Sequence, residues 1–383
     1  MDDVIIVGAG PAGASAAYFL SQAGLRVRVL EKARLPRYKA CGGGLSPCML
    51  SRYFPFSFDG VIETRASAVR YAYRGEMVTV PLHEDDLAFV MRSRLDAFIL
   101  EHARAEVHQG AAVRQVVEKA DRVEVTTTAG ERYAARYVIG ADGANSIVGR
   151  ALRQRARQRP VAAIEVETPA APSALADIGR APLFILGDIA YGYAWVFPKA
   201  VHLSVGIAAW RPGPGELQAS LRSIMARLGI DLGQGVWHGH PIPINGGYRR
   251  LVTRRILLAG DAAGLADPLT GEGIRLAIKS GWLAAQAIAR GDSRHYARAV
   301  RAQIASSHGL GLPLAVVFYS AMSPCYALGV CNPLASRAFI TMLSDRIHYA
   351  GLIARLFGTL PLYLAQESFR MIGQLAKRKK LSG

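Results

Sequence analysis

Residues 1–32 read MDDVIIVGAGPAGASAAYFLSQAGLRVRVLEK, and the order of apolar residues and glycines predicts a strand, a tight turn, a helix and a second strand. Gly8, Gly10 and Gly13 form a G-x-G-x-x-G pattern. The first glycine permits the turn, the second lets the backbone approach a pyrophosphate, and the third lets the helix pack closely on the strand. The second strand ends at Glu31, a carboxylate placed to accept the hydroxyls of an adenosine ribose. The combination predicts a dinucleotide-binding unit, with an ordinary tight turn of an α/β domain as the alternative.

The composition favours an anionic partner. The 383 residues include 46 Lys and Arg against 29 Asp and Glu, a formal net charge of +17, and 51 % of the residues are hydrophobic. This balance suits a membrane face, a phosphorylated lipid or nucleic acid, and the lack of any nucleic-acid motif disfavours the last. The N-terminus lacks the pattern of a secretory signal. The four cysteines fit neither a metal site nor a disulfide framework. We therefore expect a cytoplasmic protein without a metal, peripheral to the inner face of the membrane.

A glycine-rich loop follows the first unit. Residues 36–47 read PRYKACGGGLSP, and three consecutive glycines between prolines exclude the interior of a helix or strand. We expect the backbone of this loop to contact a ligand, with Cys41 at its edge. A flexible surface connector is the alternative.

The strand-then-glycine pattern recurs at residues 137–143 (YVIGADG) and 255–264 (RILLAGDAAG). The three copies predict one nucleotide-binding domain in three pieces, residues 1–60, 92–160 and 245–290, whose polar groups meet at the carboxyl edge of a parallel sheet. Alternating apolar residues predict a β-rich substrate-binding domain from residues 61–91 and 161–244, with a helix at 215–228. Residues 107–117 and 122–128 are predicted to pair as strands. The fold class is therefore α/β: a Rossmann-like domain, an inserted antiparallel sheet and a helical C-terminal region from 291 to 383.

The C-terminal region contains a long uncharged stretch. Residues 309–336 are 28 residues without a formal charge, long enough to span a bilayer. Pro313, Pro324 and Pro333 interrupt it, so we expect broken helices that form an apolar wall rather than a transmembrane helix. The basic cluster at residues 377–380 (KRKK) suits either a membrane contact or a solvated terminus.

The three glycine segments and the helix start RSRLD at residues 92–96 resemble the FAD fingerprints of the para-hydroxybenzoate hydroxylase-like flavoprotein superfamily. Within it, KACGG at 39–43, YAWVFPK at 193–199 and DPLTGEGI at 267–274 resemble the geranylgeranyl reductase family. The resemblance covers most of the first 290 residues. It implies FAD as cofactor, bound by Gly8, Gly10, Ala12, Gly13, Glu31, Lys32, Cys41, Gly42, Arg92, Val113, Asp142, Gly260, Asp261, Gly271, Gly273 and Ile274.

The resemblance also implies roles for some of these residues. Val113 is expected near the adenine, Arg92 at the phosphate or ribityl region, and Asp261 on ribityl or ribose hydroxyls, where it can also cap a helix. A helix that begins at Ile274 is expected to point its positive end at the pyrimidine edge of the flavin, where reduced flavin carries negative charge. A carboxylate near that edge would oppose the same charge. We therefore expect Glu272 to turn away towards backbone N–H groups.

The implied reaction suits an aromatic site. An isolated C=C bond has no carbonyl to polarise it, so hydride addition requires protonation and gives the transition state carbocation character, which aromatic faces stabilise. Tyr193, Trp195 and Phe197 alternate along a predicted strand and so project from one face. We expect all three to bind substrate and the first two to act in catalysis. Lys199 is expected to meet a phosphate head group or be solvated, and Cys41 to donate a proton, gate the flavin or be a small buried side chain.

The sequence thus predicts an FAD-dependent reductase that saturates C=C bonds of a geranylgeranyl-type lipid drawn from an anionic membrane. A second dinucleotide motif is lacking, so the electron donor is expected to be NADPH docking transiently or a ferredoxin-like carrier. An FAD-dependent monooxygenase or halogenase of the same superfamily is one alternative, although tyrosine and phenylalanine stand where tryptophan halogenases carry tryptophan. A non-catalytic, flavin-containing prenyl-lipid carrier is the other. The head group, whether diphosphate, chlorophyll precursor, ether lipid or quinone, stays open.

Overall fold

The computed structural model describes residues 1–152, 161–170, 178–233, 235–244 and 250–381, without the side chains of 370–381. The first sheet consists of β1 (Asp2–Val7), β2 (Val27–Glu31), β8 (Glu106–Gln109), β9 (Val113–Glu118), β10 (Val123–Thr127), β11 (Arg132–Gly140) and β17 (Ile256–Leu258). Its order is β8-β2-β1-β11-β10-β9, with β17 beside β11. The pairs β2–β1, β1–β11, β2–β8 and β11–β17 are parallel, while β9 and β10 extend the sheet in antiparallel fashion. This is the predicted Rossmann-like sheet.

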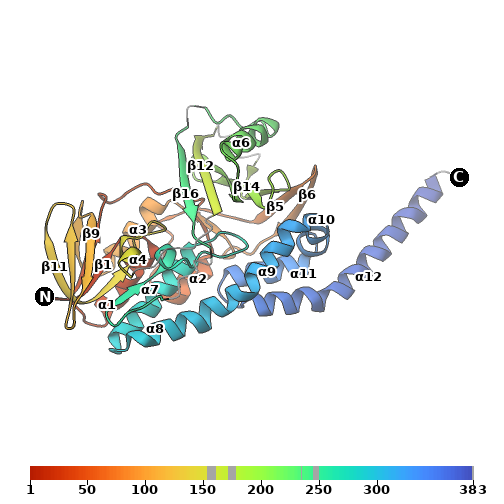
Figure 1. The fold of residues 1–383 in the computed structure, drawn as a ribbon. Coiled ribbons are helices and arrows are strands. Elements are labelled where there is room, and N and C mark those ends of the chain that lie inside the picture. Colours follow the sequence, from red (N-terminus) through yellow and green to blue (C-terminus); the bar gives the residue numbers. More distant parts are fainter. Residues whose placement is uncertain (153–160, 171–177, 234, 245–249, 382–383) are drawn as a thin grey trace.

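Helices cover this sheet because its strands are apolar on both faces. They are α1 (Pro11–Gln22), α3 (Arg92–Glu101), α4 (Ile147–Ala151) and α7 (Ile274–Ala289), together with the short 3₁₀ turn η1 (Gly260–Ala263). Helix α1 packs against both α3 and α7. The strand-to-helix turns therefore converge at one edge of the sheet, as the three glycine segments predict (Figure 1).

A second sheet stands beside the first (Figure 1). It consists of β16 (Trp237–Ile242), β12 (Val161–Pro169), β15 (His202–Trp210), β14 (Gly192–Pro198), β13 (Leu183–Leu186), β5 (Ala68–Tyr73) and β6 (Glu76–Pro81), in this order. All pairs are antiparallel except β13–β5. Helix α6 (Glu216–Arg227) packs on β15 and β12, and a small sheet of β3 (Gly44–Leu45), β7 (Ala88–Val90) and β4 (Ile62–Arg65) precedes α3, with α2 (Pro47–Tyr53) following β3.

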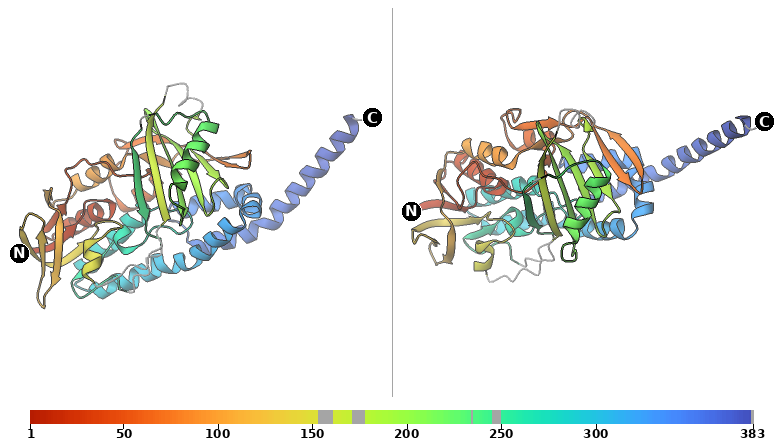
Figure 2. Two further views of the ribbon diagram at one scale, coloured as in Figure 1. Left: turned by 45° about the horizontal axis from the view of Figure 1, so that its top comes forward. Right: turned by 90° about the horizontal axis from the view of Figure 1, so that it is seen from above.

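The C-terminal region is helical. Its elements are α8 (Ser293–Val300), the π-helical turn η2 (Arg301–Ala305), α9 (Ser306–Ser320), α10 (Met322–Cys325), the π-helical turn η3 (Tyr326–Val330), α11 (Pro333–Leu343) and α12 (Tyr349–Leu381). Figure 1 and both views of Figure 2 show the end of α12 projecting well beyond the rest of the molecule.

The structure confirms the predicted fold class and the broken helices of residues 309–336. By length and composition no single described helix could cross a bilayer, whereas the helix pair Ser293–Ser320 and Met322–Val330, which is bent by 112° at its break, passes that test. The prediction of one strand over residues 107–117 is wrong. The run divides at Gly110, which has a φ of +75°. The strand before it, β8, pairs with β2, and the strand after it, β9, pairs with β10. The predicted domain limits near residues 160 and 245 adjoin segments outside the described residues and remain predictions.

A buried ion cluster attaches the C-terminal helices to the first domain. Asp345, between α11 and α12, accepts hydrogen bonds from Tyr53 Oη (3.0 Å), Arg275 Nη1 (3.2 Å) and Lys279 Nζ (3.0 Å). Its side chain is 1 % exposed. Burial disfavours the charged form, but Lys279 and Arg275 outweigh it and hold the pKa of Asp345 below its usual value. The cluster therefore fixes the α11–α12 connection against α7 and α2.

We predict that Asp345→Asn lowers the free energy of unfolding by about 3–5 kcal/mol, because Lys279 stays buried without its carboxylate partner and Arg275 keeps only Glu272 and Asp267. Chemical denaturation followed by circular dichroism measures the change. Asp121→Asn is the matched control, since the carboxylate of Asp121 is exposed and pairs only at the surface with Arg122. Equal stability of the two variants would contradict the role given to the buried cluster.

Candidate active site

One cavity of about 1200 Å³ joins the two sheets and the C-terminal helices. Its nucleotide end lies at the edge of the first sheet and is lined by Gly8, Gly10, Ala12, Glu31, Lys32, Arg37, Arg92, Val113, Asp142, Asp261, Gly271, Gly273 and Ile274. Its apolar end is lined by Tyr71, Phe89, Phe184, Leu186, Tyr193, Trp195, Phe197, Leu314, Val317, Phe318, Leu328, Phe339, Leu356 and Phe357. The 36–44 loop lies where the two ends meet. The cavity exceeds the range of about 300–1,000 Å³ typical of sites for drug-sized ligands, so it has room for two molecules.

The glycine turn shows why two of its glycines cannot be replaced. Gly8 has φ +98°, and a Cβ there would lie 2.4 Å from the carbonyl oxygen of Ala141. A Cβ on Gly13 would lie 1.9 Å from the carbonyl oxygen of Gly8. Gly13 does not line the cavity and acts only by letting α1 pack on β1.

Gly10 is different, because a Cβ there would touch side chains only and no backbone. Its φ is −73°, which any residue adopts, and the Cβ would lie 3.7 Å from Arg92 Nη2 and 3.8 Å from Arg37 Nη2, within ordinary van der Waals contact. Two guanidinium groups thus lie close to the N-terminus of α1 on the cavity wall. This arrangement suits a pyrophosphate, which accepts hydrogen bonds from both.

The two arginines are held by buried carboxylates. Arg92 Nε and Nη2 donate to Asp96 at 2.9 and 2.8 Å. Burial disfavours the cation, yet Asp96 outweighs it and raises the pKa of Arg92. Arg37 lies 3.4 Å from Glu31 and 3.3 Å from Asp96. Arg37 was not among the residues predicted from the sequence. The available signal was its position in the 36–44 loop, five residues before the first of the three glycines.

Glu31 lines the nucleotide end, as predicted, and also holds the turn. It is 3 % exposed and accepts hydrogen bonds from the backbone N–H groups of Ala9 (2.7 Å) and Ala33 (3.1 Å). Lys32 and Val113 line the same end. Contact of these side chains with an adenosine remains a prediction.

Two predicted cofactor residues serve mainly other purposes. Asp142 lines the cavity, but its carboxylate accepts from Ser146 Oγ and from the backbone N–H groups of Ile147 and Val148, which starts α4. Burial raises its pKa. Gly260 does not line the cavity. With φ +59°, it packs between α1 and α7. The predicted cofactor contact at Gly260 is therefore not supported, and Asp261 is the side chain that residues 255–264 present to the cavity.

The 36–44 loop is pinned by the second sheet. Glu165 Oε1 on β12 accepts from Tyr38 Oη (2.6 Å) and from the backbone N–H of Cys41 (2.7 Å). Lys199 directly follows β14, and its Nζ donates to the carbonyl oxygens of Gly42 and Val90, each at 2.8 Å.

This geometry corrects the role predicted for Lys199. The side chain is 2 % exposed and does not line the cavity, and burial lowers its pKa. Because its N–H groups donate to Gly42 and Val90 carbonyls, it orders the loop and does not present a charge to a phosphate head group. The structure therefore does not support the predicted contact between Lys199 and a substrate.

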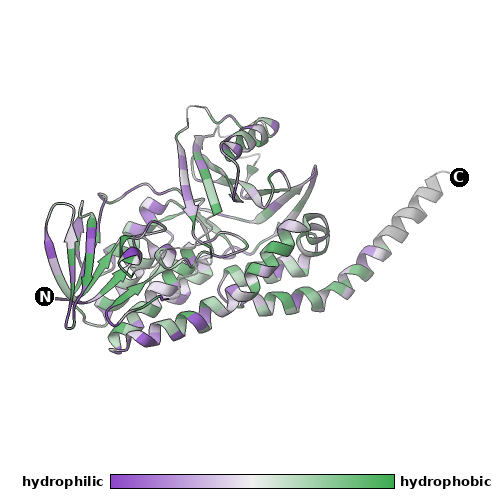
Figure 3. Ribbon diagram, in the orientation of Figure 1, coloured by the Kyte–Doolittle hydropathy of each residue, from purple (hydrophilic) through white to green (hydrophobic). Residues whose placement is uncertain are grey.

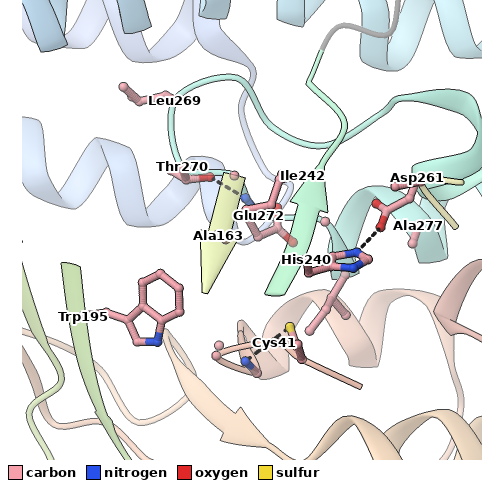
Figure 4. Close-up of a pocket in the computed structure, with 18 of the residues that line it drawn as sticks. Cys41, Ala163, Trp195, His240, Ile242, Asp261, Leu269, Thr270, Glu272 and Ala277 are labelled. Atoms are coloured by element: carbon pink, nitrogen blue, oxygen red, sulfur yellow. Dashed lines mark hydrogen bonds and ion pairs between the residues drawn. The ribbon is translucent and has the colours of Figure 1, made fainter. Parts of the chain in front are cut away.

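A chain of polar side chains crosses the junction between the two ends. Lys39 Nζ lies 3.0 Å from His240 Nε2, which lies 3.5 Å from Asp261 Oδ2 (Figure 4). Burial lowers the pKa of Lys39. Burial opposes ionisation of Asp261, but His240, Lys39 and Arg92 outweigh it and hold the pKa of Asp261 below its usual value. Lys39 and His240 were missed as site residues, because nothing local marks a contact across 201 positions of the sequence.

The predicted aromatic strip exists. Tyr193, Trp195 and Phe197 of β14 all line the apolar end, and the rings of the last two stack with centroids 6.0 Å apart. Tyr193 Oη donates to the carbonyl oxygen of Thr270. Trp195 Nε1 is buried and has no acceptor among the described residues. A Cβ on Gly42 would lie 2.8 Å from the ring of Phe197, so the glycine loop packs directly on the strip.

Cys41 lies between Trp195 and the His240–Asp261 pair (Figure 4). It lines the cavity and is a free thiol, whose sulfur accepts from the backbone N–H of Gly43 at 3.4 Å. The described residues contain no cluster of side chains suited to a metal ion. Cys41 is thus placed for either of its predicted active roles, as proton donor or as gate, and which one applies remains a prediction.

The start of α7 behaves as expected. Glu272 lines the cavity, but its carboxylate accepts from the backbone N–H of Arg275 (2.7 Å) and from Arg275 Nε (3.1 Å), the expected turn towards the backbone. Burial raises the pKa of Glu272, and Arg275 opposes this. Gly273 and Ile274 also line the cavity, and a Cβ on Gly273 would lie 3.4 Å from Asp261 Oδ1. The positive end of the α7 dipole therefore faces the nucleotide end with the Asp261 carboxylate beside it.

Comparison with known proteins decides the family. Residues 1–177 match the family model described as FAD binding domain. Over 303 residues the chain is 32 % identical to geranylgeranyl diphosphate reductase of Rhodobacter capsulatus, with 74 % of each chain covered. The chain belongs to the geranylgeranyl reductase family. Over 340 residues it is also 30 % identical to menaquinone reductase of Mycobacterium tuberculosis, with 82 % of each chain covered.

Solved structures share the fold. A geranylgeranyl bacteriochlorophyll reductase-like protein of Thermoplasma acidophilum matches with a TM-score of 0.77 and 21 % identity, covering 95 % of this chain and 98 % of that chain. Halogenase PltM in complex with phloroglucinol and FAD matches with a TM-score of 0.70 and 18 % identity, covering 95 % and 85 %. With the family settled, this geranylgeranyl reductase homologue is an FAD-dependent oxidoreductase. The donors of Arg37, Arg92 and the α1 N-terminus at Gly10, which together line the nucleotide end, fit the FAD pyrophosphate.

We predict that Gly10→Ala lowers FAD affinity by about tenfold or more while leaving the fold intact, because its Cβ would occupy the space between α1 and the two arginines without touching backbone. Flavin fluorescence titration and thermal unfolding of the apoprotein measure the two effects. Gly13→Ala, by contrast, should unfold the domain, and Gly60→Ala, with no atom within 4 Å of its Cβ, should change neither property. Normal FAD binding by Gly10→Ala would contradict the assigned pyrophosphate position.

Proposed function

We propose that the protein is an FAD-dependent reductase that saturates C=C bonds in a geranylgeranyl-type isoprenoid chain. The observation that carries the proposal is the joined cavity. Its nucleotide end holds the charged side chains, whereas the residues named above for its apolar end include no Asp, Glu, Lys or Arg. An apolar chain can therefore lie beside the cofactor without leaving a buried charge unpaired. The relatives described above, a geranylgeranyl diphosphate reductase and a menaquinone reductase, support the same class of substrate.

The aromatic strip suits the chemistry of an isolated double bond. FAD, when bound in its reduced form, supplies the hydride. Protonation gives the substrate carbocation character, and each desolvated aromatic face stabilises such a centre by about 1–2 kcal/mol. Tyr193, Trp195 and Phe197 form the wall next to the glycine loop, and the Tyr193–Thr270 hydrogen bond fixes the first ring.

The proton has nearby sources. Cys41, Lys39 and His240 all line the junction of the two ends. The depressed pKa of Lys39 makes its ammonium a readier proton donor than a solvated lysine, and His240 links it to Asp261. In this proposal Cys41 delivers the proton, because the next residue, Gly42, packs on Phe197 of the aromatic strip. The Lys39–His240 pair then returns a proton to the Cys41 thiolate.

The electrons come from outside this chain in the proposal, from NADPH docking transiently or from a ferredoxin-like carrier. The sequence has no second G-x-G-x-x-G unit that would hold a nicotinamide.

An anaerobic assay tests the proposed reaction. The purified protein is reduced with dithionite and incubated with geranylgeranyl diphosphate or a prenylated quinone. The masses of the products are then measured by mass spectrometry. A gain of about two mass units per reduced bond is expected, one hydride plus one proton. A requirement for oxygen would favour the monooxygenase or halogenase alternative. Lipid binding without turnover of either substrate would favour the carrier.

We predict that Trp195→Leu lowers the turnover number about 5–30-fold, the equivalent of about 1–2 kcal/mol of lost cation stabilisation, and retains the flavin. Flavin absorbance per protein and anaerobic turnover are measured together. Trp210→Leu is the control, because Trp210 packs near the same strands on β15 but does not line the cavity. Loss of flavin from Trp195→Leu, or equal turnover of both variants, would contradict a catalytic role for the strip.

A further inference from the structure

The apolar end of the cavity opens onto the outer surface. Val317 on α9, Leu328 on η3 and Phe357 on α12 line the cavity and are nevertheless 54 %, 36 % and 66 % exposed. The cavity wall and the protein surface are therefore one continuous apolar face at this point. We call these three residues the opening.

More exposed apolar side chains occur on the elements that form the opening. They are Leu310, Val316, Leu334, Leu362, Leu364 and Phe369 on α9, α11 and α12. Figure 3 shows hydrophobic residues over much of α9 and α11 and over the coloured part of α12. Phe369 on α12 is 76 % exposed. Such a concentration of exposed apolar side chains is typical of an interaction surface.

The charges of these elements indicate what covers them. Residues 302–336 contain no Asp, Glu, Lys or Arg. Along α12 the sequence carries one acidic residue, Glu367, against six basic ones: Arg355, Arg370, Lys377, Arg378, Lys379 and Lys380. Apolar side chains followed by a basic helix end complement a bilayer with anionic head groups.

We infer that α9, α10, η3, α11 and α12 dock on an anionic lipid bilayer, and that the substrate chain enters the cavity from the bilayer through the opening. The identity of the entering chain rests on the proposed function; the docking does not. Among the described residues, those named for the apolar end include no cation for a phosphate head group, and Lys199 donates to loop carbonyls instead. The head group therefore stays at the bilayer surface while the isoprenoid chain reaches the aromatic strip.

Flotation with vesicles tests the docking. Vesicles of phosphatidylcholine and phosphatidylglycerol are mixed with the holoprotein and floated through a density gradient. The triple variant Val316→Asp, Leu362→Asp, Phe369→Asp changes exposed side chains that do not line the cavity. Its vesicle-bound fraction should fall about tenfold or more, since three charges would have to enter the apolar layer. Val201→Asp, at a 75 % exposed position of the β14–β15 turn, should float like the wild type.

A second readout separates this inference from the proposed function. Turnover of a detergent-solubilised isoprenoid should be the same for the triple variant and the wild type, because neither the cofactor nor the cavity is changed. Flotation without any turnover would overturn the proposed reaction and leave the docking intact. Wild-type protein that does not float, or a triple variant that floats equally well, would overturn the docking. So would a wild-type dimer in solution that the triple variant converts to a monomer, since the surface would then serve self-association.

Discussion

The site depends on two buried side chains of the second sheet that hold a loop of the first domain. Glu165 binds the Tyr38 hydroxyl and the Cys41 backbone, and Lys199 binds the carbonyls of Gly42 and Val90. Without these two side chains, the glycine loop would lose the hydrogen bonds that the structure shows between it and the side chains of β12 and of the residue after β14. With them, the loop backbone lies against Phe197 and separates charged from uncharged surroundings within a single cavity.

That separation explains the division of chemistry. Arginines and carboxylates gather at the nucleotide end, where ion pairs such as Arg92–Asp96 keep each charge compensated while buried. Beyond β14 the wall is aromatic and aliphatic. This division suits the proposed function, in which an anionic cofactor lies beside the arginines and an apolar chain lies along the uncharged wall of the same cavity.

Sequence reasoning succeeded where the determinants are local. The positive φ of Gly8, the close contact of Gly13 with Gly8, the buried β1 run and the turn of Glu272 towards Arg275 follow from neighbours within a few positions or from one βαβ unit. It failed where function depends on distant partners. Lys199 looked like a head-group ligand because its loop carbonyls lie more than 100 positions away, and Lys39 and His240 meet across even more of the chain. The division of residues 107–117 was missed for the same reason, since β8 pairs with β2 and not with its neighbour in sequence.

The cluster around Asp345 has a mechanical consequence. Arg275 binds Glu272 at the first turn of α7 and Asp345 between α11 and α12. One guanidinium group therefore ties the cavity-facing start of α7 to the connection that precedes the last helix. Displacing that connection would require either a shift of the first turn of α7 or the separation of buried charges, so the position of the C-terminal helices and the shape of the nucleotide end depend on each other.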